Sequence, residues 1–348
     1  MTHESAVALY RKYRPNTFKE VRDQDHIVTV LEGAIAKKQI PHALLFAGSR
    51  GTGKTTLARI FAREIGTSEI DLYEIDAASN RGIDDIRELK EAVHTLPYES
   101  ERKVYIIDEV HMLTKEAFNA LLKTLEEPPA HVVFILATTE EEKLLDTIRS
   151  RCQVFRFRAP SRAVLAKTVT DVAKKEGFKL KAEAADLIAI AADGSFRDAL
   201  GIAQKVMLAS GDEIGGADEV ATIIGAPKNE LLRTLVGALA SQDMEAAIGA
   251  VKAARGEHVD MKLFLRLLLE RIRAVMLVRN VPASADEYLA AFSDADAAQV
   301  KELAASDKTA LNSHTLLRLL ESAEQLNYSS IPELPLELAI MELCQKEK

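Results

Sequence analysis

The sequence has few of the residues that mark secreted, metal-stapled or membrane proteins. Among 348 residues there are two Cys and no Trp, and aromatic residues make up only 5%. Cys152 and Cys344 lie far apart and form no metal-ligand spacing, which excludes a disulfide framework and a zinc knuckle. No apolar run approaches the roughly 18 residues of a membrane span, and the N-terminus lacks a basic-then-apolar signal pattern. We therefore expect a cytoplasmic protein with no membrane partner.

An excess of positive charge is also missing. The chain carries 45 Lys+Arg against 53 Asp+Glu, a net charge of -8. This balance argues against a generic basic coat for nucleic acid, although a local basic surface remains open. Hydrophobic residues make up 47% of the chain, enough for real cores, so a mainly disordered protein is excluded. The length predicts two or three domains.

Short apolar runs alternate with helical patterns in the first part of the chain. Strands separated by helix-length segments are typical of βαβ units, and their nearly all-apolar composition indicates strands covered on both faces. The sequence therefore predicts a parallel α/β sheet with strands at Ala43–Ala47, Leu72–Ile75, Val104–Ile107, Val132–Ala137 and Val154–Phe157.

After Pro160 the pattern becomes helical throughout. Ser161 is a plausible helix N-cap, and Gly177 and Gly194 are plausible helix ends. Helices are predicted at Ala163–Glu176, Ala182–Ala192 and Phe196–Ala209, followed by a turn-rich break and a long helical block. We expect an α/β domain over residues 1–159, a small helical domain over 160–222 and an all-α domain over 223–348.

A phosphate-binding motif follows the first predicted strand. Gly48-Ser-Arg-Gly-Thr-Gly-Lys-Thr55 fits G-x-x-x-x-G-K-[ST], and a helix is predicted to follow it at Thr56–Ile65. The glycines let backbone N–H groups form an anion nest, and the helix N-terminus adds partial positive charge. We expect Lys54 to reach the β- and γ-phosphates of ATP and Thr55 to bind Mg²⁺. The predicted ATP-binding residues here are Gly48, Ser49, Arg50, Gly51, Thr52, Gly53, Lys54, Thr55 and Thr56.

A second motif, Val104-Tyr-Ile-Ile-Asp-Glu-Val-His111, ends an apolar strand in two carboxylates. Such a strand delivers Asp108 to the carboxyl edge of the sheet, where α/β proteins bind ligands. Asp108 is expected in the Mg²⁺ shell, and Glu109 is expected to act as the general base toward the attacking water. His111 is interpreted as a hydrogen-bonded structural residue.

Other candidates surround this predicted centre. Thr138 and Thr139 end a strand, where a hydroxyl can bond a γ-phosphate, although the pattern alone favours ordinary strand-end threonines. Arg149–Arg158 holds four arginines and no acid; solvent accounts for Arg156 and Arg158, whereas Arg149 and Arg151 could reach a phosphate. Cys152 is interpreted as a small buried residue rather than a nucleophile.

Arg197 falls in the first turn of a helix, where the helix dipole disfavours a cation. A bound γ-phosphate would offset that mismatch, and a carboxylate such as Asp198 is the alternative.

Taken together the motifs resemble the AAA+ clamp-loader ATPases, among them the gamma/tau subunits of bacterial DNA polymerase III. The resemblance is dense over about the first 200 residues and loose in the helical remainder. It rests on these stretches: Arg11-Lys-Tyr-Arg-Pro15, Gln24-Asp-His26, the phosphate loop, Glu74-Ile-Asp-Ala-Ala-Ser-Asn80, Asp108-Glu-Val-His-Met-Leu113, Phe118–Pro129, Ala137-Thr-Thr139, Ser150-Arg-Cys152 and Gly194-Ser-Phe-Arg-Asp-Ala199.

The resemblance implies an α/β P-loop AAA+ module, a small helical lid domain and an all-α collar domain for oligomerisation. It places Thr139 at the sensor-1 position and Arg197 at the sensor-2 position. It makes Arg151 an arginine finger that acts on ATP bound by the neighbouring subunit. It also makes Tyr10, Arg14 and Pro15 the wall of the adenine pocket.

The resemblance further implies a motor subunit that loads a sliding clamp onto primed DNA. Its implied partners are other clamp-loader subunits (gamma/tau copies, delta-type and delta-prime-type subunits), the clamp, and primer–template DNA held through its phosphate backbone. The alternative for Arg81, Arg87 and Lys123 is a solvated helix face beside Asp84, Asp85 and Glu88. The expected DNA contacts are Asn80, Arg81, Arg87, Lys123 and Thr147.

Two departures from the family pattern are visible. A four-cysteine zinc module usually precedes the Glu-Ile-Asp-Ala-Ala-Ser strand, but here only Gly66–Asp71 joins the segments, so no zinc is expected and the cofactors are ATP and Mg²⁺. The chain also stops at the end of the collar-like block, as a naturally short form or a piece of a longer protein would.

Three rival functions fit the phosphate-binding motif less well. An unfoldase or branch-migration motor is disfavoured because no aromatic–apolar–Gly pore loop lies within Asp76–Glu101. A non-hydrolysing scaffold subunit is disfavoured because Lys54, Thr55 and Glu109 are all present. A nucleoside kinase would leave the Ser150-Arg-Cys152 element and the helical C-terminal part unexplained.

Overall fold

The computed structural model describes residues 7–80, 82–211, 213–214, 216–289, 292–306 and 309–345. The chain divides into two compact units. The first comprises Met1–Leu165 with Ala192–Gly201, and the second comprises Ala166–Ala191 with Ile202–Lys348. Each unit is described by itself below.

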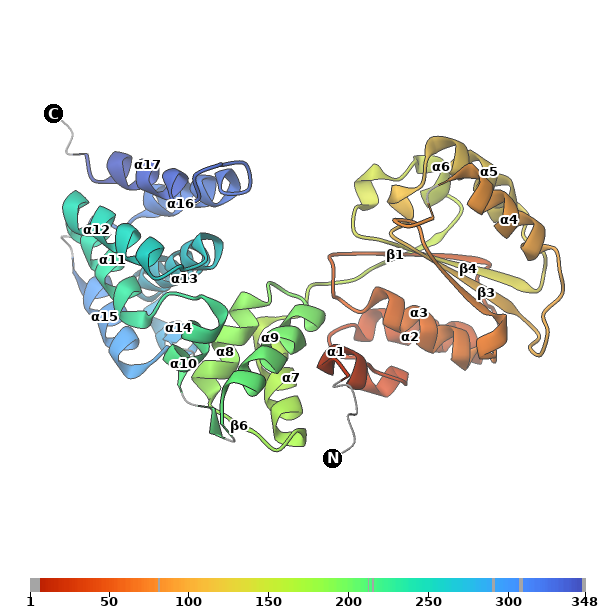
Figure 1. Cartoon of the computed structure of the whole chain (residues 1–348), viewed down its shortest axis with the longest axis horizontal. Coiled ribbons are helices and arrows are strands. Elements are labelled where there is room, and N and C mark those ends of the chain that lie inside the picture. Colours follow the sequence, from red (N-terminus) through yellow and green to blue (C-terminus); the bar gives the residue numbers. More distant parts are fainter. Residues whose placement is uncertain are drawn as a thin grey trace. The chain divides into compact units, whose positions relative to one another are not determined.

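A five-stranded parallel sheet forms the centre of the first unit (Figure 1). The strands run in the order β2-β3-β4-β1-β5, and every pair is parallel. Because Ala47 pairs with Thr138 and Asp76 pairs with Asp108, the carboxyl ends of four strands meet at one edge. All five predicted strands are confirmed, with bounds β1 (Ala43–Ala47), β2 (Leu72–Asp76), β3 (Lys103–Asp108), β4 (Val132–Thr138) and β5 (Gln153–Arg156).

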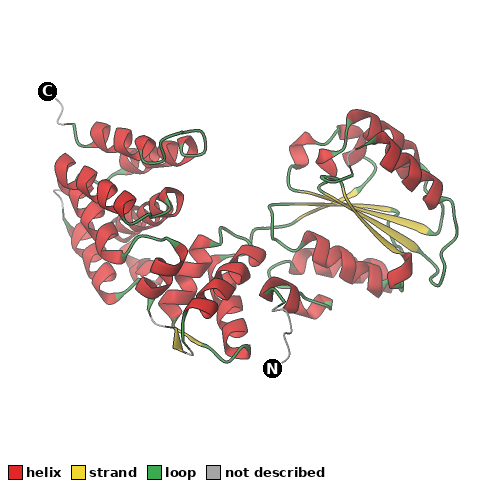
Figure 2. Cartoon of the chain, viewed as in Figure 1, coloured by secondary structure: helices red, strands yellow, loops and turns green. Residues whose placement is uncertain are grey.

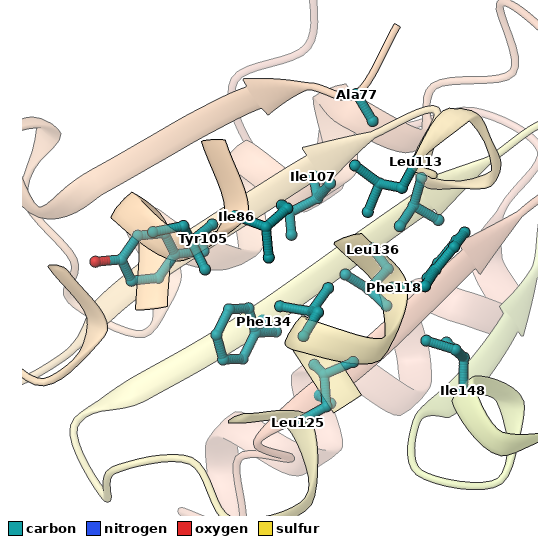
Figure 3. Packing of buried hydrophobic residues seen from close by; sticks show 14 of the residues in the cluster. Ala77, Ile86, Tyr105, Ile107, Leu113, Phe118, Leu125, Phe134, Leu136 and Ile148 are labelled. Atoms are coloured by element: carbon teal, nitrogen blue, oxygen red, sulfur yellow. The ribbon is translucent and has the colours of Figure 1, made fainter. Parts of the chain in front are cut away.

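The inner strands are apolar on both faces because helices cover both faces. Leu44, Phe46 and Ile106 contribute to one core, which packs against α2 (Asp25–Ala36) and α3 (Lys54–Glu64). Tyr105 and Phe134 belong to the other core, which packs against α4 (Ile83–Val93) and α5 (Lys115–Glu126). Figure 3 shows this second core, in which Tyr105 and Ile107 of β3 and Phe134 and Leu136 of β4 lie among Phe118 and Leu125 of α5.

Short elements complete the first unit. They connect the strands and carry several of the predicted site residues. They are α1 (Leu9–Lys12), α6 (Asp146–Arg149) and the 3-10 turns η1 (Phe18–Glu20), η2 (Glu69–Asp71), η3 (Val110–Met112) and η4 (Glu141–Lys143).

Asp71 ties one loop to the start of β2. Its buried carboxylate accepts backbone N–H bonds from Tyr98 at 2.7 Å, Glu99 at 2.9 Å and Ser100 at 2.8 Å. Burial opposes ionisation of this group, but the three donors outweigh it and lower the pKa of Asp71 to about 2. An ionised carboxylate therefore holds the loop that leads into β3.

The described part of the second unit is almost entirely helical (Figure 2). The three helices predicted after Pro160 are confirmed to within a residue at each end, as α7 (Arg162–Lys175), α8 (Ala182–Ala191) and α9 (Phe196–Ala209). The strands β6 (Lys179–Leu180) and β7 (Glu213–Ile214) form a short parallel pair. The later elements are α10 (Ala217–Ile224), α11 (Asn229–Ser241), α12 (Met244–Gly256), α13 (Met261–Asn280), η5 (Pro282–Ser284), α14 (Ala285–Leu289), α15 (Asp294–Ala305), α16 (Ser313–Gln325) and α17 (Leu334–Leu343).

A buried ionic cluster joins three of these helices. Asp296 Oδ1 on α15 accepts from Arg271 Nη1 on α13 at 2.8 Å and from Arg233 Nη1 on α11 at 2.9 Å. Asp296 and Arg271 are 2% and 5% exposed, so the charges are desolvated together. Burial would raise the pKa of Asp296, but the guanidiniums and the Ser293 hydroxyl outweigh it and lower that pKa.

None of the helices in the described ranges combines the length and the apolar composition that crossing a bilayer requires.

Candidate nucleotide-binding site

The loop between β1 and α3 wraps around its own lysine. Gly51 and Gly53 have φ of +74° and +104°, a left-handed backbone that glycine adopts without strain. Lys54 begins α3, and its ammonium donates to the carbonyl oxygens of Gly48 at 2.7 Å and Ser49 at 2.9 Å. A cation that is only 6% exposed and bonded only to carbonyls lies where a phosphate group would be neutralised.

Burial is the main influence on the Lys54 ammonium and lowers its pKa. The carboxylates of Glu109 and Asp108 act in the opposite direction. Both acids therefore lie close enough to this loop to share one electrostatic site with Lys54.

Thr55 and Asp108 meet at the carboxyl edge of the sheet. The Thr55 hydroxyl donates to Asp108 Oδ2 at 2.7 Å, although 53 residues separate the two in the chain. A hydroxyl and a carboxylate are the hard oxygen ligands that Mg²⁺ binds, usually together with water and phosphate oxygens. This predicted pair therefore fits an Mg²⁺ ion.

Glu109 has a strained backbone and a fixed side chain. Its φ is +49°, in the left-handed region that is uncommon for residues other than glycine. Glu109 Oε2 accepts from the Thr139 hydroxyl at 2.8 Å and from the Thr139 backbone N–H at 3.2 Å. The structure thus brings the predicted base together with Thr139 from the end of β4, where chemistry alone favoured an ordinary threonine.

A polar cavity of about 580 Å³ lies between α1, α3 and the start of α9. Three predicted site residues, Tyr10, Arg14 and Arg197, line it, and the Arg197 guanidinium lies 5.8 Å from the Tyr10 ring centroid. Burial lowers the pKa of Arg14, and repulsion from Arg59 and Arg197 lowers it further. A basic cavity of this kind fits an anionic ligand.

Three residues of this cavity were missed by sequence reasoning: Arg11, Asn16 and Arg59. Arg59 lies four residues after Thr55 on α3, and this one-turn spacing was the signal that could have identified it. Its guanidinium also pairs with Glu74 on β2 at 2.5 Å. Pro15 lies between Arg14 and Asn16 in the chain.

The phosphate-binding loop is joined to the segment that carries Arg197. The Gly51 carbonyl accepts a hydrogen bond from the Phe196 backbone N–H at 3.0 Å. A Cβ at Gly51 would come 1.9 Å from Ser195 Oγ, so only glycine allows this approach. Ser195 Oγ also accepts from the Asp198 backbone N–H at 3.1 Å, which caps α9. Asp198 was the alternative partner expected for Arg197; the hydrogen bond described here involves its backbone N–H and Ser195.

Three of the arginines of Arg149–Arg158 pair with acids. Arg156 donates to Glu141 through two nitrogens, at 2.9 and 2.6 Å, and its side chain is still 71% exposed, so an ion pair accompanies the expected solvation. Arg149 pairs with Asp146. Arg151 Nε donates to Glu126 Oε1 on α5 at 2.7 Å, and Arg151 Nη1 donates to the Thr147 carbonyl at 2.7 Å.

Cys152 follows Arg151 and packs partly buried against the core under α5. Burial raises the pKa of this thiol to about 12, which keeps it protonated and unreactive at neutral pH. This agrees with the prediction that Cys152 is a small buried residue.

The candidate DNA contacts lie on three helices on one side of the sheet (Figure 1). Asn80 precedes α4 and donates to the Asp76 carbonyl at 3.1 Å. Arg87 on α4 pairs with Asp84 at 3.0 Å, so part of the solvated-face alternative is present. Lys123 is exposed on α5, and Thr147 lies on α6. Arg81 lies outside the described residues.

The described ranges contain no group of three or more His, Cys, Asp or Glu side chains that could hold a metal ion. The Mg²⁺ ligands considered above are the hydroxyl–carboxylate pair of Thr55 and Asp108.

Three family models match successive parts of the chain. Residues 67–161 match the DNA polymerase III delta subunit, and residues 165–211 match the ATPase lid domain of the DNA polymerase III clamp loader subunit. Residues 216–348 match domain III of the DNA polymerase III subunits gamma and tau.

Curated relatives carry the same names. The chain is 33% identical to the DNA polymerase III subunit tau of Bacillus subtilis, over 97% of this chain and 63% of that protein. It is 36% identical to the DNA polymerase III subunit gamma/tau of Mycobacterium bovis, over 80% of this chain and 52% of that protein. The chain thus spans between about half and two thirds of these relatives.

Solved structures share the fold. The RuvB Holliday junction branch migration motor of Thermotoga maritima superposes with a TM-score of 0.53 and 22% identity, over 69% of this chain and 85% of that one. At this identity the likeness supports an AAA+ architecture alone.

Proposed function

Because the chain belongs to the family of clamp-loader subunits named gamma and tau in DNA polymerase III, we propose that it is an ATP-dependent motor subunit of a clamp loader. It would bind and hydrolyse ATP to load a sliding clamp onto primed DNA during replication. One observation carries this proposal: the Lys54 loop, the Thr55–Asp108 pair and the Glu109–Thr139 pair meet at one edge of the sheet.

The residues around the loop have complementary roles in this proposal. Lys54 and the loop N–H groups neutralise the phosphates, and Thr55 and Asp108 hold Mg²⁺, which withdraws charge from the phosphate oxygens when bound. Glu109 orients the attacking water and takes up its proton. The hydrogen bond from the Thr139 hydroxyl fixes the orientation of the Glu109 carboxylate. Arg197 offsets the charge of the γ-phosphate from the start of α9, where it lines one cavity with Tyr10 and Arg14. Tyr10, Arg14 and Pro15 form the wall of the pocket for the adenine ring of ATP.

Arg151 completes the site of a neighbouring subunit in this proposal. It lies just before the edge strand β5 and is about one third exposed, so another protomer can reach it. A guanidinium supplied in trans stabilises the charge of the phosphoryl-transfer transition state and contributes roughly 10³–10⁵ in rate. Nucleotide state would then control the stability of the assembly, and hydrolysis would release the clamp.

The remaining expectations become part of the same proposal. Asn80, Arg81, Arg87, Lys123 and Thr147 would contact the DNA backbone without reading sequence. The clamp and other clamp-loader subunits would be the protein partners. The matches over 165–211 and 216–348 support the proposed order of module, lid (160–222) and collar (223–348).

The test is ATP turnover by the full chain assembled with its partner subunits, with and without sliding clamp and primed DNA. Lys54→Ala should abolish ATP binding, because it removes the buried ammonium of the loop, whereas the other cation of the loop, Arg50, is exposed. Glu109→Gln should retain ATP binding and lose turnover by about 10²-fold or more. Lys37→Ala, an exposed lysine at the end of α2, is the matched control and should behave as wild type.

Two outcomes would contradict the proposal. Unchanged ATP affinity in Lys54→Ala would remove the nucleotide site. Turnover that does not respond to clamp and primed DNA in the assembled wild type would remove the clamp-loading function.

A further inference from the structure

His111 is a buried titratable residue that the proposed function does not use. It lies in η3, two residues after Glu109, and its side chain is only 6% exposed. A solvated or incidental histidine would not be buried so deeply next to a proposed base.

The imidazole lies close to Glu109 and to two residues at the end of β4, Thr138 and Glu140. His111 Nδ1 lies 2.9 Å from the Thr138 hydroxyl and 3.5 Å from Glu109 Oε2. His111 Nε2 lies 3.3 Å from Glu140 Oε1. Thr138 Oγ1 also accepts from the Glu140 backbone N–H at 3.0 Å. The ring therefore ties the turn after β3 to the turn after β4.

The two ring nitrogens of His111 serve different turns. An Nε2–H that donates to Glu140 leaves Nδ1 to accept the hydrogen of the Thr138 hydroxyl. These contacts fix the ring beside the Glu109 carboxylate, 3.5 Å from Oε2.

Other charged groups lie around this ring. Glu140 also pairs with Lys143 on η4 at 2.5 Å, which shares the charge of that carboxylate. Glu109 also interacts electrostatically with Lys54 of the phosphate site, as does Asp108. Glu109 and Glu140 are thus the two acids that contact the imidazole.

We propose that His111 is a positioning residue for Glu109: it braces the turn after β3 against the turn after β4, and these two turns hold the Glu109 carboxylate. This rests on the proposed role of Glu109 as the base.

The experiment compares three substitutions of His111 in the assembled full-chain complex with clamp and primed DNA. Asparagine places an amide where Nδ1 lies, and glutamine reaches toward the position of Nε2. We expect His111→Asn to keep kcat within about threefold of wild type, and His111→Ala to lose about 10- to 100-fold. His111→Gln should fall between them, and KM for ATP should change less than twofold in all three.

The split between kcat and KM provides the second readout. His111→Ala should lower kcat and leave KM for ATP nearly unchanged, because the ring braces the turns around Glu109. His131→Gln is the matched control: His131 contacts the carbonyls of Val93 and Thr95 at 3.2 and 3.1 Å, at the opposite end of the sheet. Its kcat and KM should both match those of wild type.

Each outcome decides one question. If His111→Asn matches His111→Ala in kcat, or if KM for ATP rises as much as kcat falls, the positioning role alone is overturned. If Glu109→Gln hydrolyses ATP like wild type, Glu109 is not the base, and the proposal for His111 is overturned with it. Thermal unfolding of each variant identifies a loss of kcat that comes from misfolding.

Discussion

Arg151 is paired within its own chain with Glu126. Arg151 Nε donates to Glu126 Oε1 at 2.7 Å, and Nη1 donates to the Thr147 carbonyl at 2.7 Å. The side chains are 32% and 43% exposed, so this is a surface ion pair worth at most about 1 kcal/mol. An ion pair of that strength keeps the guanidinium next to Glu126. It is weak enough that Arg151 can exchange the Glu126 carboxylate for a phosphate group.

Removing Glu126 should therefore release Arg151 for its proposed partner. We predict that Glu126→Ala raises DNA-stimulated ATP turnover of the assembled complex by up to about fivefold, the rate equivalent of about 1 kcal/mol. Glu127→Ala, the exposed neighbour, is the matched control. In an Arg151→Ala background the Glu126 effect should vanish. A lower rate in Glu126→Ala would mean that the pair aids the finger and does not restrain it.

Gly51 should tolerate no side chain. A Cβ there meets Ser195 Oγ at 1.9 Å on a backbone with φ of +74°. We predict that Gly51→Ala weakens ATP binding at least tenfold and lowers the melting temperature, measured by titration and by thermal unfolding. Gly66→Ala is the control, because Gly66 also has a positive φ, +84°, but has open space around its Cβ position.

The comparison separates backbone strain from collision. Gly66→Ala should cost only about 1–2 kcal/mol of unfolding free energy, the cost of left-handed backbone. Adding Ser195→Gly to Gly51→Ala removes the colliding atoms and should recover part of the affinity. Equal ATP affinity in Gly51→Ala and wild type would show that the loop does not depend on its contact with Ser195.

Asp71 should make stability depend on pH in a defined window. Its folded pKa of about 2 lies below the ordinary value of 3.8, so its contribution is fully present above about pH 4. That contribution is lost as pH falls from about 4 toward 2, where the folded carboxylate gains its proton. Asp71→Asn should lower the free energy of unfolding at pH 7.

The difference in unfolding free energy between wild type and Asp71→Asn should then shrink between pH 4 and pH 2.5, as measured by urea denaturation. Glu69→Gln, two residues earlier and exposed, should leave this pH dependence unchanged. A difference that stays constant with pH would show that the three backbone donors do not depend on the Asp71 charge.

Asp296 should be the most sensitive charged residue of the second unit. Asp296→Ala leaves Arg271 and Arg233 without their shared partner, and breaking a buried pair in this way typically costs about 3–5 kcal/mol. Chemical denaturation of the full chain measures the cost. Asp294→Ala, exposed on the same helix, should change stability by about 0.5 kcal/mol or less. Similar losses in both variants would contradict the buried-cluster account.

Much of the fold follows from local pattern. The strands of the sheet are apolar runs, because alternate residues face one or the other of the two cores that lie between the sheet and its helices. The apolar runs alone were therefore enough to identify the strands. The phosphate loop was equally predictable, since its glycines and Lys54 are adjacent in the chain. The bond between Thr55 and Asp108 followed from placing both at one sheet edge.

Contacts between distant segments could not be predicted in this way. The pairing of the exposed Arg156 with Glu141 was not predicted, because Glu141 comes from a turn before α6. The approach of Ser195 to Gly51 spans more than a hundred residues and leaves no local pattern. The role of Thr139 was predicted only from the family resemblance, because a strand-end threonine alone gives no such signal. Its hydrogen bond to Glu109 is seen only in the structure.

The left-handed backbone of Glu109 has a practical consequence for variant design. At φ of +49° a β-branched side chain would clash with its own carbonyl, whereas an unbranched one is accommodated. A hydrolysis-deficient trap for capturing loaded assemblies should therefore carry glutamine at position 109, and valine or isoleucine should be avoided. Those two would remove the carboxylate and distort the turn together, so a crippled enzyme could not be told apart from a damaged scaffold.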